Sequence, residues 1–590
     1  MKSHPNVSLL AGYPKLARVV DHLDQYLKRR HPSFFGESAT HPVLPTKRSK
    51  VVHDALWGTV RFSWREMALI DSPIIQRLRD LHQTGLAFYV YPSAHHSRFE
   101  HSLGAVTIAS RVFDALLHKQ RREIRDLVRS LTSNNDQELV DLLILRLKQE
   151  LRLAALLHDT GHSLYSHTSE RVYEKLDLLM EAARELSSFV GKEKGAGEVI
   201  SFCLALTPAV SSLLSRAGEH LIGEAESDDY DGEIDLTNVA LIIVGRSSNP
   251  FLQWLGDIVS SGFDADKLDY LLRDARTAGL PLTYDVDRYL YDVRIEREIL
   301  PDDQGEIEKL LARIGGTPVT RHPASGQARY PYYETYRLRL SRRAMNVIEQ
   351  IMICKMMLFS YIYHHGKVRA AEGILERLLS RRLDLWRANG DTDELIFSRF
   401  LDMTDAWLRH SLGDEINDDL ANEYEYRLIN RLIPREVYNI SGPSATHAQR
   451  VMIEDFLIDL HDRERRAGVI SSLEQAIGEE LVKLRPELGP DPVMAAALAG
   501  VWVDAPKPPK FEDVDDVVMG TTSGTPTGPV MQIFPIREWI QAYEHYRYQV
   551  RIFAFSEYWD LTVAAAKTAM QRTLGIQSEL FYNSIRRNRH

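Results

Sequence analysis

Cysteine is almost absent from this chain of 590 residues, and long apolar runs are missing altogether. The two cysteines, Cys203 and Cys354, lie far apart, so they exclude a disulfide framework and a thiolate zinc site. Reducing compartments keep thiols free, so we expect a cytoplasmic location. No stretch of about 18 consecutive apolar residues occurs, and we therefore expect no membrane span and no membrane partner. The N-terminus also lacks the apolar core of a signal peptide.

An excess of positive charge is missing as well. The chain has 72 Lys and Arg residues against 82 Asp and Glu residues, which gives a formal net charge of −10. A duplex-DNA binder needs a basic surface to neutralise phosphates, so nucleic acid is not a favoured partner. A local basic pocket for a small phosphorylated substrate remains compatible with this charge. Apolar residues at 44% and charged residues at 26% are typical of a globular protein.

Alternating, strand-like patterns are scarce, whereas helical patterns are common. Segments such as 138–158 and 346–365 place apolar residues at intervals of three and four. The best alternating run is 50–64, whose central glycine suits a small hairpin. The fold class predicted is mostly α, with a helical core, a small β-hairpin element and a C-terminal α/β appendage.

Changes in composition along the chain predict its organisation. Three prolines between 506 and 509 mark a boundary, and the stretch 520–529 is rich in Gly, Thr and Pro, a composition typical of a flexible loop. The predicted parts are an N-terminal arm (1–45), a core (46–380), a helical C-terminal region (381–505) and a C-terminal appendage (506–590) with a flexible loop (519–529).

Three short stretches concentrate the side chains that bind metals, at 95–104, 156–167 and 263–274. In the second, an apolar helical pattern runs directly into His158 and Asp159. A buried carboxylate must be paired or ligated, because burying it alone is very costly. Imidazole and carboxylate together suit Fe, Mn or Zn, and a carboxylate-rich site also suits Mg.

The third stretch has the spacing of a functional helix. Asp266, Tyr270 and Arg273 share one helical face, while Lys267, Tyr270 and Asp274 share an overlapping one. Such faces can combine a metal ligand with a phosphate contact. The alternative is an exposed charged helix with internal ion pairs, since charge runs usually lie in solvent.

These stretches occur in the order found in a known family. Six short motifs resemble those of the HD-domain metal-dependent phosphohydrolases. The resemblance is to the deoxynucleoside triphosphate triphosphohydrolase branch, which includes the sterile-alpha-motif/HD-domain enzyme and the bacterial dGTPases. The resemblance covers about 50–280, without a sterile-alpha-motif domain in the first 45 residues, and is carried by DSPIIQRLR (71–79), YP (91–92), RFEHSLG (98–104), HDTGH (158–162), YSH (165–167) and DKLDY (266–270).

The resemblance implies the roles of individual residues. It implies one or more divalent metal ions, of undetermined identity among Mn, Fe, Mg and Zn, held by His101, His158, Asp159 and Asp266. It implies catalytic roles for His162, His167, Asp266 and Glu193. It implies substrate-binding roles for Gln83, Arg98, Lys267, Tyr270, Asp274, Lys355 and Tyr363.

Two positions depart from the family pattern. Lys192 stands where the family often has a histidine assigned to proton transfer, and lysine is a poor general acid at neutral pH unless burial lowers its pKa. Either the acid is then His162, His167 or His220, or the site acts on a different leaving group. Thr84 follows Gln83 where the mammalian enzyme has an apolar residue that excludes a ribose 2′-hydroxyl, so selectivity between deoxy and ribo substrates stays open. The neighbouring His95 and His96 are expected in a surface loop.

The resemblance implies hydrolysis of (deoxy)nucleoside triphosphates to nucleoside and triphosphate. A bound divalent metal lowers the pKa of water for attack on the α-phosphorus. Two alternatives stay open. One is an HD-type phosphodiesterase or nuclease acting on nucleic-acid ends or cyclic nucleotides. The other is a nucleotide-sensing regulatory protein with weak turnover.

The family resemblance also implies assembly and regulation. We expect a homo-oligomer (a dimer, tetramer or hexamer), with an activating nucleotide as a possible further partner. Asp71, Gln76 and Arg79 match positions that bind an activating nucleotide in the mammalian enzyme, and a helix over 72–83 is predicted to carry most of them. The alternative is that the arginines of this helix serve only as structural caps or ion pairs.

Overall fold

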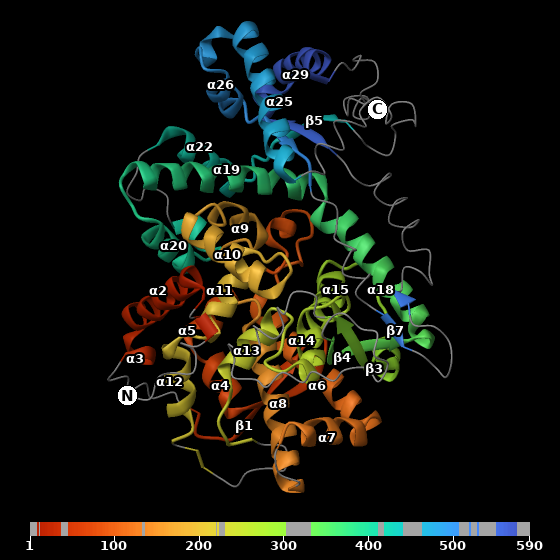
Figure 1. The fold of residues 1–590 in the computed structure, drawn as a ribbon. Coiled ribbons are helices and arrows are strands. Elements are labelled where there is room, and N and C mark those ends of the chain that lie inside the picture. The colour runs from red at the N-terminus through yellow and green to blue at the C-terminus, as the bar shows by residue number, and fades with distance from the viewer. Residues whose placement is uncertain are drawn as a thin grey trace.

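Helices make up most of the structure, and the sheets are small, which confirms the mostly α prediction (Figure 1). Positions 521–527 of the predicted flexible loop lie outside the described residues, as does His220. The computed structural model describes residues 9–10, 12–36, 45–132, 136–219, 221–222, 230–301, 332–410, 418–440, 463–506, 518–520, 528–529 and 550–574.

The first half of the chain forms a helical body around a large apolar core. Its central pair is α6 against α8, and α15 packs on α6 from another side. The helical elements of this body are α2 (Pro14–Arg30), α3 (Pro32–Phe35), α4 (Trp64–Ile70), α5 (Pro73–Gln76), η1 (Arg77–Asp80), η2 (Gly85–Tyr89), α6 (Arg98–Lys119), α7 (Arg121–Ser130), α8 (Gln137–Leu157), α9 (His167–Tyr173), α10 (Asp177–Val190), α11 (Ala196–Ala205), α12 (Pro208–Ala217), α13 (Leu236–Ile243), η3 (Pro250–Leu252), α14 (Gln253–Val259), α15 (Ala265–Thr277) and α16 (Val286–Asp292).

The predicted N-terminal arm contains α2, which packs against α10 and α11. Its apolar residues Leu16, Val19 and Leu23 are buried in the main core. Lys15 reinforces the contact, because its backbone N–H donates to Glu185 at 2.9 Å. This helix is therefore an integral part of the body.

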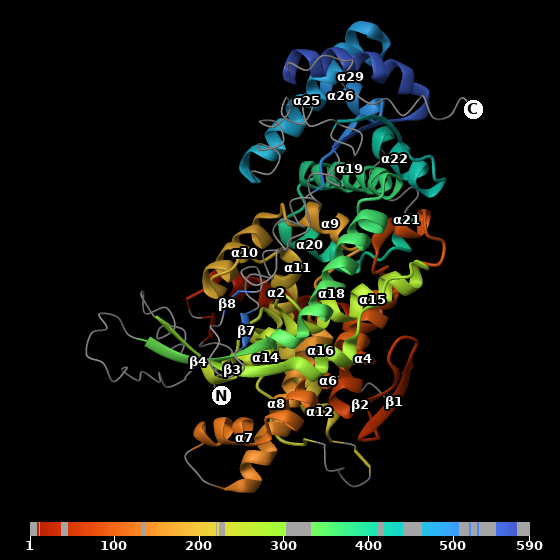
Figure 2. The same ribbon diagram turned by 90° about the vertical axis from the view of Figure 1, so that its right-hand side faces the viewer.

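The hairpin expected over 50–64 is present. Strands β1 (Ser49–Asp54) and β2 (Gly58–Ser63) pair antiparallel, with Ser49 opposite Ser63. Gly58 begins β2 with a φ of +75°, which a side chain would disfavour. Figure 2 shows the hairpin beside α4 and α6, which it contacts.

Among the described residues after α16, the strands form two further small sheets. One has the order β3-β4-β7-β8 and the other the order β5-β9-β6. The strands are β3 (Val293–Pro301), β4 (Tyr332–Ser341), β5 (Arg435–Asn439), β6 (Trp502–Asp504), β7 (Val518–Gly520), β8 (Gly528–Pro529) and β9 (Arg551–Ala554).

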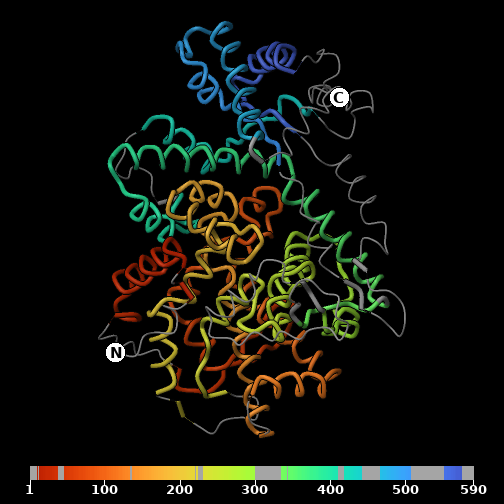
Figure 3. Tube along the Cα trace, viewed as in Figure 1, coloured from red at the N-terminus to blue at the C-terminus, as the bar shows by residue number. Residues whose placement is uncertain are grey.

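A second apolar core lies in the C-terminal part, where α25 packs on α26 and α29 beside the three-stranded sheet. Figure 3 shows α19 running between the body and this part. The remaining helical elements are η4 (Arg342–Ala344), α18 (Met345–Leu358), η5 (Phe359–Tyr363), α19 (Gly366–Ala388), α20 (Asp393–Asp402), α21 (Trp407–His410), α22 (Asp419–Ile429), α25 (Arg463–Leu484), η6 (Pro486–Leu488), α26 (Pro492–Leu498), η8 (Ser556–Tyr558) and α29 (Trp559–Leu574).

The predicted domain limits can be placed on these elements. The limit between 380 and 381 falls inside α19. The limit between 505 and 506 separates β6 from β9, which pair in one sheet. The first apolar core extends to Leu428 and also includes Phe555, and the second begins at Val437.

The helix expected over 72–83 is interrupted. The structure has the short α5 followed by the 3₁₀ turn η1, which ends at Asp80. His82 then pairs with Ser97 as an isolated β-bridge, and the N–H of Arg98 donates to the carbonyl of Leu81 at 2.9 Å. Pairing with the segment before α6 therefore takes the backbone of 81–82 out of the helix.

One stretch in the described part of the chain, Met345–Tyr363, is long and apolar enough to cross a membrane. Within the fold, 44% of that stretch is buried, and a core helix passes the same test of length and composition. α11 and α12 pass the test together but are bent by 48°. The expectation of no membrane span stays a prediction.

A glycine allows α6 and α15 to pack closely. A Cβ built on Gly104 would lie 1.9 Å from Oδ1 of Asp269 and 2.4 Å from a guanidinium nitrogen of Arg273. Because both side chains are buried and hydrogen-bonded to each other, they have little room to give way. Position 104 therefore sets the distance between the two helices.

We expect Gly104→Ala to destabilise the fold by about 1–3 kcal/mol, because overpacking forces side chains and backbone to shift. Gly468→Ala in α25 is the matched control, since its Cβ would meet nothing within 4 Å. That control should leave stability unchanged or raise it, because alanine is the better helix former. Thermal unfolding of the two variants tests this. A Gly104→Ala variant with the melting temperature of the native protein would contradict the packing argument.

Candidate metal centre and active site

Three helix ends meet at one cluster of imidazoles and carboxylates. The first turn of α6 supplies His101, and the end of α8 supplies His158 and Asp159. The first turn of α15 supplies Asp266. The apolar pattern of α8 buries its last turn, so the polar pair that follows is delivered into the interior.

The four side chains lie close together. Ligand atoms of His101, His158 and Asp159 lie within 4.8 Å of one another. Nε2 of His101 is 3.3 Å from Nε2 of His158 and 3.6 Å from Oδ2 of Asp159. Oδ1 of Asp266 is 3.0 Å from Nε2 of His101 and 3.7 Å from Nε2 of His158.

Each histidine has its outer nitrogen already bonded. Nδ1 of His101 lies 2.8 Å from Oδ2 of Asp269, and Nδ1 of His158 lies 2.7 Å from the carbonyl of Ala155. These bonds fix Nδ1 as the donor and direct Nε2 of both rings toward the cluster. Metal-bound histidines are oriented by such outer partners.

The cluster carries negative charge that favours cations. Burial lowers the pKa of His101, but the carboxylates of Asp266 and Asp269 outweigh burial and raise that pKa to about 10. Burial raises the pKa of Asp159, but Arg98 and then His158 hold it well below its usual range. In the metal-free protein, protons and guanidinium therefore balance the carboxylates.

This donor set fits a divalent metal ion. Two imidazoles and two carboxylates are the ligands that Fe, Mn and Zn use, and a carboxylate-rich centre also suits Mg. The Nε2 atoms converge and the carboxylates favour positive charge, so these side chains fit a divalent metal ion. His101, His158, Asp159 and Asp266 are thus the candidate ligands.

Arg98 lies against the cluster at the start of α6. Its guanidinium pairs with Asp159, and its Nε donates to the hydroxyl of Ser166 at 2.8 Å. Ser166 in turn donates to the carbonyl of His82 at 2.7 Å and has a φ of +58°. Non-glycine residues rarely adopt this conformation, and such strain is concentrated at functional sites.

A second cluster lies beside the first and consists of His162, His167 and Glu170. Nδ1 of His167 is 3.0 Å from Glu170 Oε2, and Nδ1 of His162 is 3.6 Å from the same atom. Nε2 of His162 is 3.3 Å from Asp159. Burial, followed by the charge of Arg98, lowers the pKa of His162.

Glu170 is the carboxylate of this second cluster, and sequence reasoning missed it. It comes three residues after His167 on α9, and this spacing places both side chains on one helical face. The same spacing could have identified Glu170 from the sequence. The predicted carboxylate, Glu193, lies exposed between α10 and α11, as does Lys192. Burial raises the pKa of Glu170, but the hydrogen bond with His167 and the charge of His162 lower it well below the usual range.

Two predicted phosphate contacts lie on α15 and α18. Lys267 follows Asp266 on α15, and its Nζ donates to Asp264 and to the carbonyl of Ser261, each at 2.8 Å. Asp264 also caps α15 by accepting the N–H of Lys267 at 2.8 Å. Lys355 is buried on α18, which packs against α15.

Asp274 joins three elements at the end of the site predicted to hold the sugar. The hydroxyl of Tyr363 donates to its Oδ2, and Nε2 of His96 lies 2.7 Å from its Oδ1. Tyr363 lies in the π-helical turn η5, a kind of turn often found at functional sites. His96 is 7% exposed, so the expectation of a surface position was wrong for this residue, whereas His95 is exposed.

Gln83 and Tyr270 complete the predicted substrate residues, and Thr84 is the neighbour of Gln83 that bears on sugar selectivity. Oε1 of Gln83 and Oγ1 of Thr84 are buried without a hydrogen-bond partner among the described residues. Buried polar atoms normally have partners, so unpaired ones call for an explanation. Tyr270 is half-buried on α15, and burial raises the pKa of its hydroxyl, which therefore stays protonated.

The candidate activator residues lie at the surface next to the centre. Gln76 and Arg79 are joined by a hydrogen bond of 2.9 Å from Nε to Oε1, and the guanidinium of Arg79 lies 3.6 Å from the ring centroid of Phe99. Asp71 caps the end of α4. Arg77 of the same segment donates to the carbonyl of His162 at 2.9 Å, which connects η1 to the second cluster.

Fold and site together define a helical protein with a His-His-Asp-Asp centre. The chain resembles the HD-domain deoxynucleoside triphosphate triphosphohydrolases. It is 30% identical over 255 residues to deoxynucleoside triphosphate triphosphohydrolase SAMHD1 of Bos taurus, covering 42% of this chain and 38% of that protein. It is 27% identical over 247 residues to the SAMHD1 homolog of Dictyostelium discoideum, covering 41% of this chain and 39% of that protein.

Other relatives share more of the chain. An uncharacterised protein of Methanocaldococcus jannaschii is 24% identical over 364 residues, covering 61% of this chain and 56% of that protein. The chain thus spans less than two thirds of each of these relatives. A crystal structure of a hypothetical protein from Aquifex aeolicus shares the fold, with a TM-score of 0.53, 19% identity, and coverage of 88% of this chain and all of that one. No protein-family model matches the chain.

We expect His101→Ala to lower the affinity for divalent metal by at least tenfold, because it removes a ligand whose ring is already oriented by Asp269. His118→Ala is the matched control, since His118 lies exposed on the same helix. Metal content after reconstitution and gel filtration, measured by elemental mass spectrometry, distinguishes the two. Equal metal content in both variants would place the metal elsewhere.

Proposed function

We propose that this chain hydrolyses (deoxy)nucleoside triphosphates to nucleoside and triphosphate, as a metal-dependent HD-type phosphohydrolase. The observation that carries the proposal is the four-residue centre of His101, His158, Asp159 and Asp266, with both imidazole Nε2 atoms converging. A divalent metal bound there would supply Lewis acidity and an activated water. The similarity to SAMHD1 proteins supports the substrate class.

Basic side chains around the centre suit a phosphoryl substrate. Arg98 is buried against Asp159, and Lys267 is held beside Asp266 on the first turn of α15. Preorganised donors of this kind stabilise the charge that develops on phosphoryl oxygens in the transition state. The substrate's phosphates would therefore lie at the first turns of α6 and α15.

The second cluster suits proton transfer. His167 is largely exposed, and its Nδ1 is bonded to Glu170, so Nε2 is the atom left to face a substrate. Glu170 stays ionised and fixes this orientation. Nε2 of His167 would donate the proton to the leaving 5′-oxygen of the nucleoside, which removes the need for an acid at Lys192.

The far end of the site suits a nucleoside. Tyr363 and His96 hold Asp274 from two sides, so that carboxylate is fixed in position. Oε1 of Gln83 and Oγ1 of Thr84 are buried, and neither has a hydrogen-bond partner in the described part of the chain. Hydroxyl groups of a sugar are the natural partners of these atoms, and Thr84 admits a 2′-hydroxyl as well as a 2′-hydrogen.

The proposal extends to regulation, in which a second nucleotide activates the enzyme. Gln76 and Arg79 would bind an activating nucleotide, and Arg77 would carry the effect to the backbone of His162. A homo-oligomer and a cytoplasmic location stay predictions.

The metal-loaded protein should convert deoxynucleoside triphosphates to nucleoside and triphosphate in a 1:1 ratio. Incubation with panels of dNTPs, NTPs, cyclic nucleotides and oligonucleotides, followed by ion-exchange chromatography, resolves the products. Monophosphates from cyclic nucleotides or oligonucleotides, without triphosphate from dNTPs, would establish the phosphodiesterase alternative. Nucleotide binding without any product would favour the alternative of a nucleotide-sensing regulatory protein.

We expect Glu170→Gln to lower kcat by roughly 10²–10⁴-fold with metal content unchanged, because His167 loses the partner that orients it as a general acid. Glu174→Gln is the matched control, since Glu174 is exposed at the end of the same helix. Steady-state rates and elemental analysis on both variants test this role. If the Glu170→Gln variant kept the native kcat, the second cluster would have no role in catalysis.

A further inference from the structure

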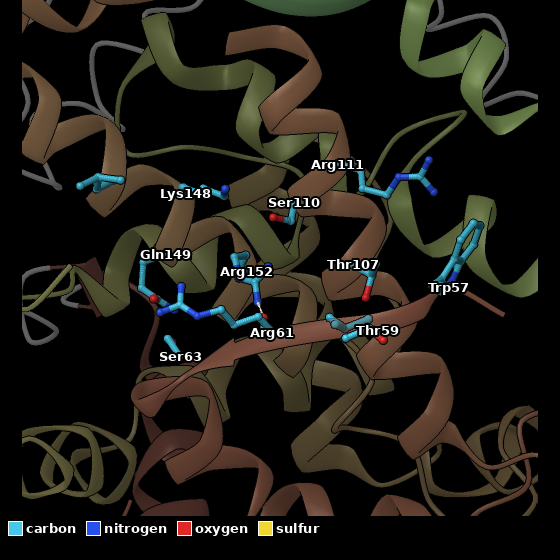
Figure 4. A pocket seen from close by; sticks show the side chains of 12 residues that line it. Trp57, Thr59, Arg61, Ser63, Thr107, Ser110, Arg111, Lys148, Gln149 and Arg152 are labelled. Carbon is cyan, nitrogen blue, oxygen red and sulfur yellow. Dashed lines mark hydrogen bonds between the residues drawn. The ribbon is translucent and has the colours of Figure 1, made fainter. Parts of the chain in front are cut away.

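A cavity separate from the metal centre lies between the hairpin, α6 and α8 (Figure 4). Its volume is about 490 Å³, within the range of small-molecule sites. α6 lines it with Ser110, nine residues after His101. Nine residues are two and a half turns, so the two side chains lie on opposite faces of the helix.

The cavity is basic although the chain as a whole is acidic. Its polar lining includes Arg61, Arg111, Lys148 and Arg152. Arg152 is held in place by buried Glu66, to which its Nη2 donates at 2.9 Å. This ion pair gives the wall of the cavity a fixed shape.

Arg111 and Lys148 are paired only loosely. Arg111 contacts Asp287 at 2.8 Å, and Lys148 contacts Asp114 at 2.7 Å. The two carboxylates are 87% and 52% exposed, and ion pairs of this kind contribute little free energy. Both cations can therefore exchange these partners for a phosphate, with which they form charge-assisted hydrogen bonds of the same kind.

A serine side chain also lines the cavity. Ser110 is 8% exposed as a residue and forms part of the cavity wall. A serine hydroxyl can donate a hydrogen bond to an oxygen of a ligand. Figure 4 shows this hydroxyl among the cationic side chains.

We propose that this cavity binds a polyphosphate chain, either as inorganic triphosphate or as the triphosphate group of a nucleotide. Arg111 and Lys148 contact the phosphates, Arg152 supports the wall, and Ser110 donates to a phosphate oxygen. Trp57 lines the same cavity and offers an aromatic face to the base of a nucleotide.

The cavity is joined to the metal centre through side chains. The indole N–H of Trp57 donates to Oδ1 of Asp269, whose Oδ2 lies 2.8 Å from Nδ1 of His101. A ligand that moves Trp57 thus changes the orientation of His101. This coupling to turnover rests on the proposed function, whereas binding in the cavity does not.

Isothermal titration of the metal-free protein with inorganic triphosphate, and separately with ATP, tests the binding. The paired substitution Arg111→Glu/Lys148→Glu should abolish one binding site per chain, because each lost charge-assisted bond weakens binding by roughly tenfold or more. Arg122→Glu/Arg121→Glu is the matched control, with the same charge change on exposed residues of α7. Ser110→Ala should weaken the same site without a change of charge.

The count of sites separates this proposal from the proposed function. If the metal centre also binds phosphates, the native protein has two sites and the variant one. If it does not, the native protein has one site and the variant none. Binding of both ligands that is unchanged in the Arg111/Lys148 variant, or no binding of either ligand to the native protein, would overturn the proposal.

Discussion

The buried carboxylate of Asp269 is the constraint on which the site depends. Its side chain is completely buried and lies 2.8 Å from Nδ1 of His101 and from Nε of Arg273. Trp57 of the hairpin donates to it as well. Burying an unpaired carboxylate is very costly, so these partners must all be in place. One residue thus joins α6, α15 and the hairpin, and it orients a candidate metal ligand.

The same constraint explains the close packing of α6 on α15. Gly104 lies one turn after His101 and leaves the space that Asp269 and Arg273 occupy. With the helices at this distance, Asp266 on the first turn of α15 reaches the imidazoles of His101 and His158. The close packing of the two helices thus supports the orientation of the imidazoles on which metal binding depends.

Local sequence patterns were enough for the mostly α class and for the hairpin, because periodicity and a turn glycine are short-range signals. Motif order was enough to select His101, His158, Asp159 and Asp266 as neighbours. The outer partners were not predictable in this way. Trp57 and Asp269 are far apart in the sequence, and nothing local marks them as a pair. The interruption of the helix over 72–83 also arises from pairing between His82 and Ser97, which local propensity does not contain.

Hydrolysis in water labelled with ¹⁸O tests the central claim most directly, because it reports which bond breaks. Attack on the α-phosphorus of a deoxynucleoside triphosphate cleaves the bond from that phosphorus to the 5′-oxygen. One labelled oxygen should then appear in the triphosphate, and the released nucleoside should carry none. Mass spectrometry that found the label in inorganic phosphate or pyrophosphate, with nucleoside mono- or diphosphate as the other product, would contradict the account.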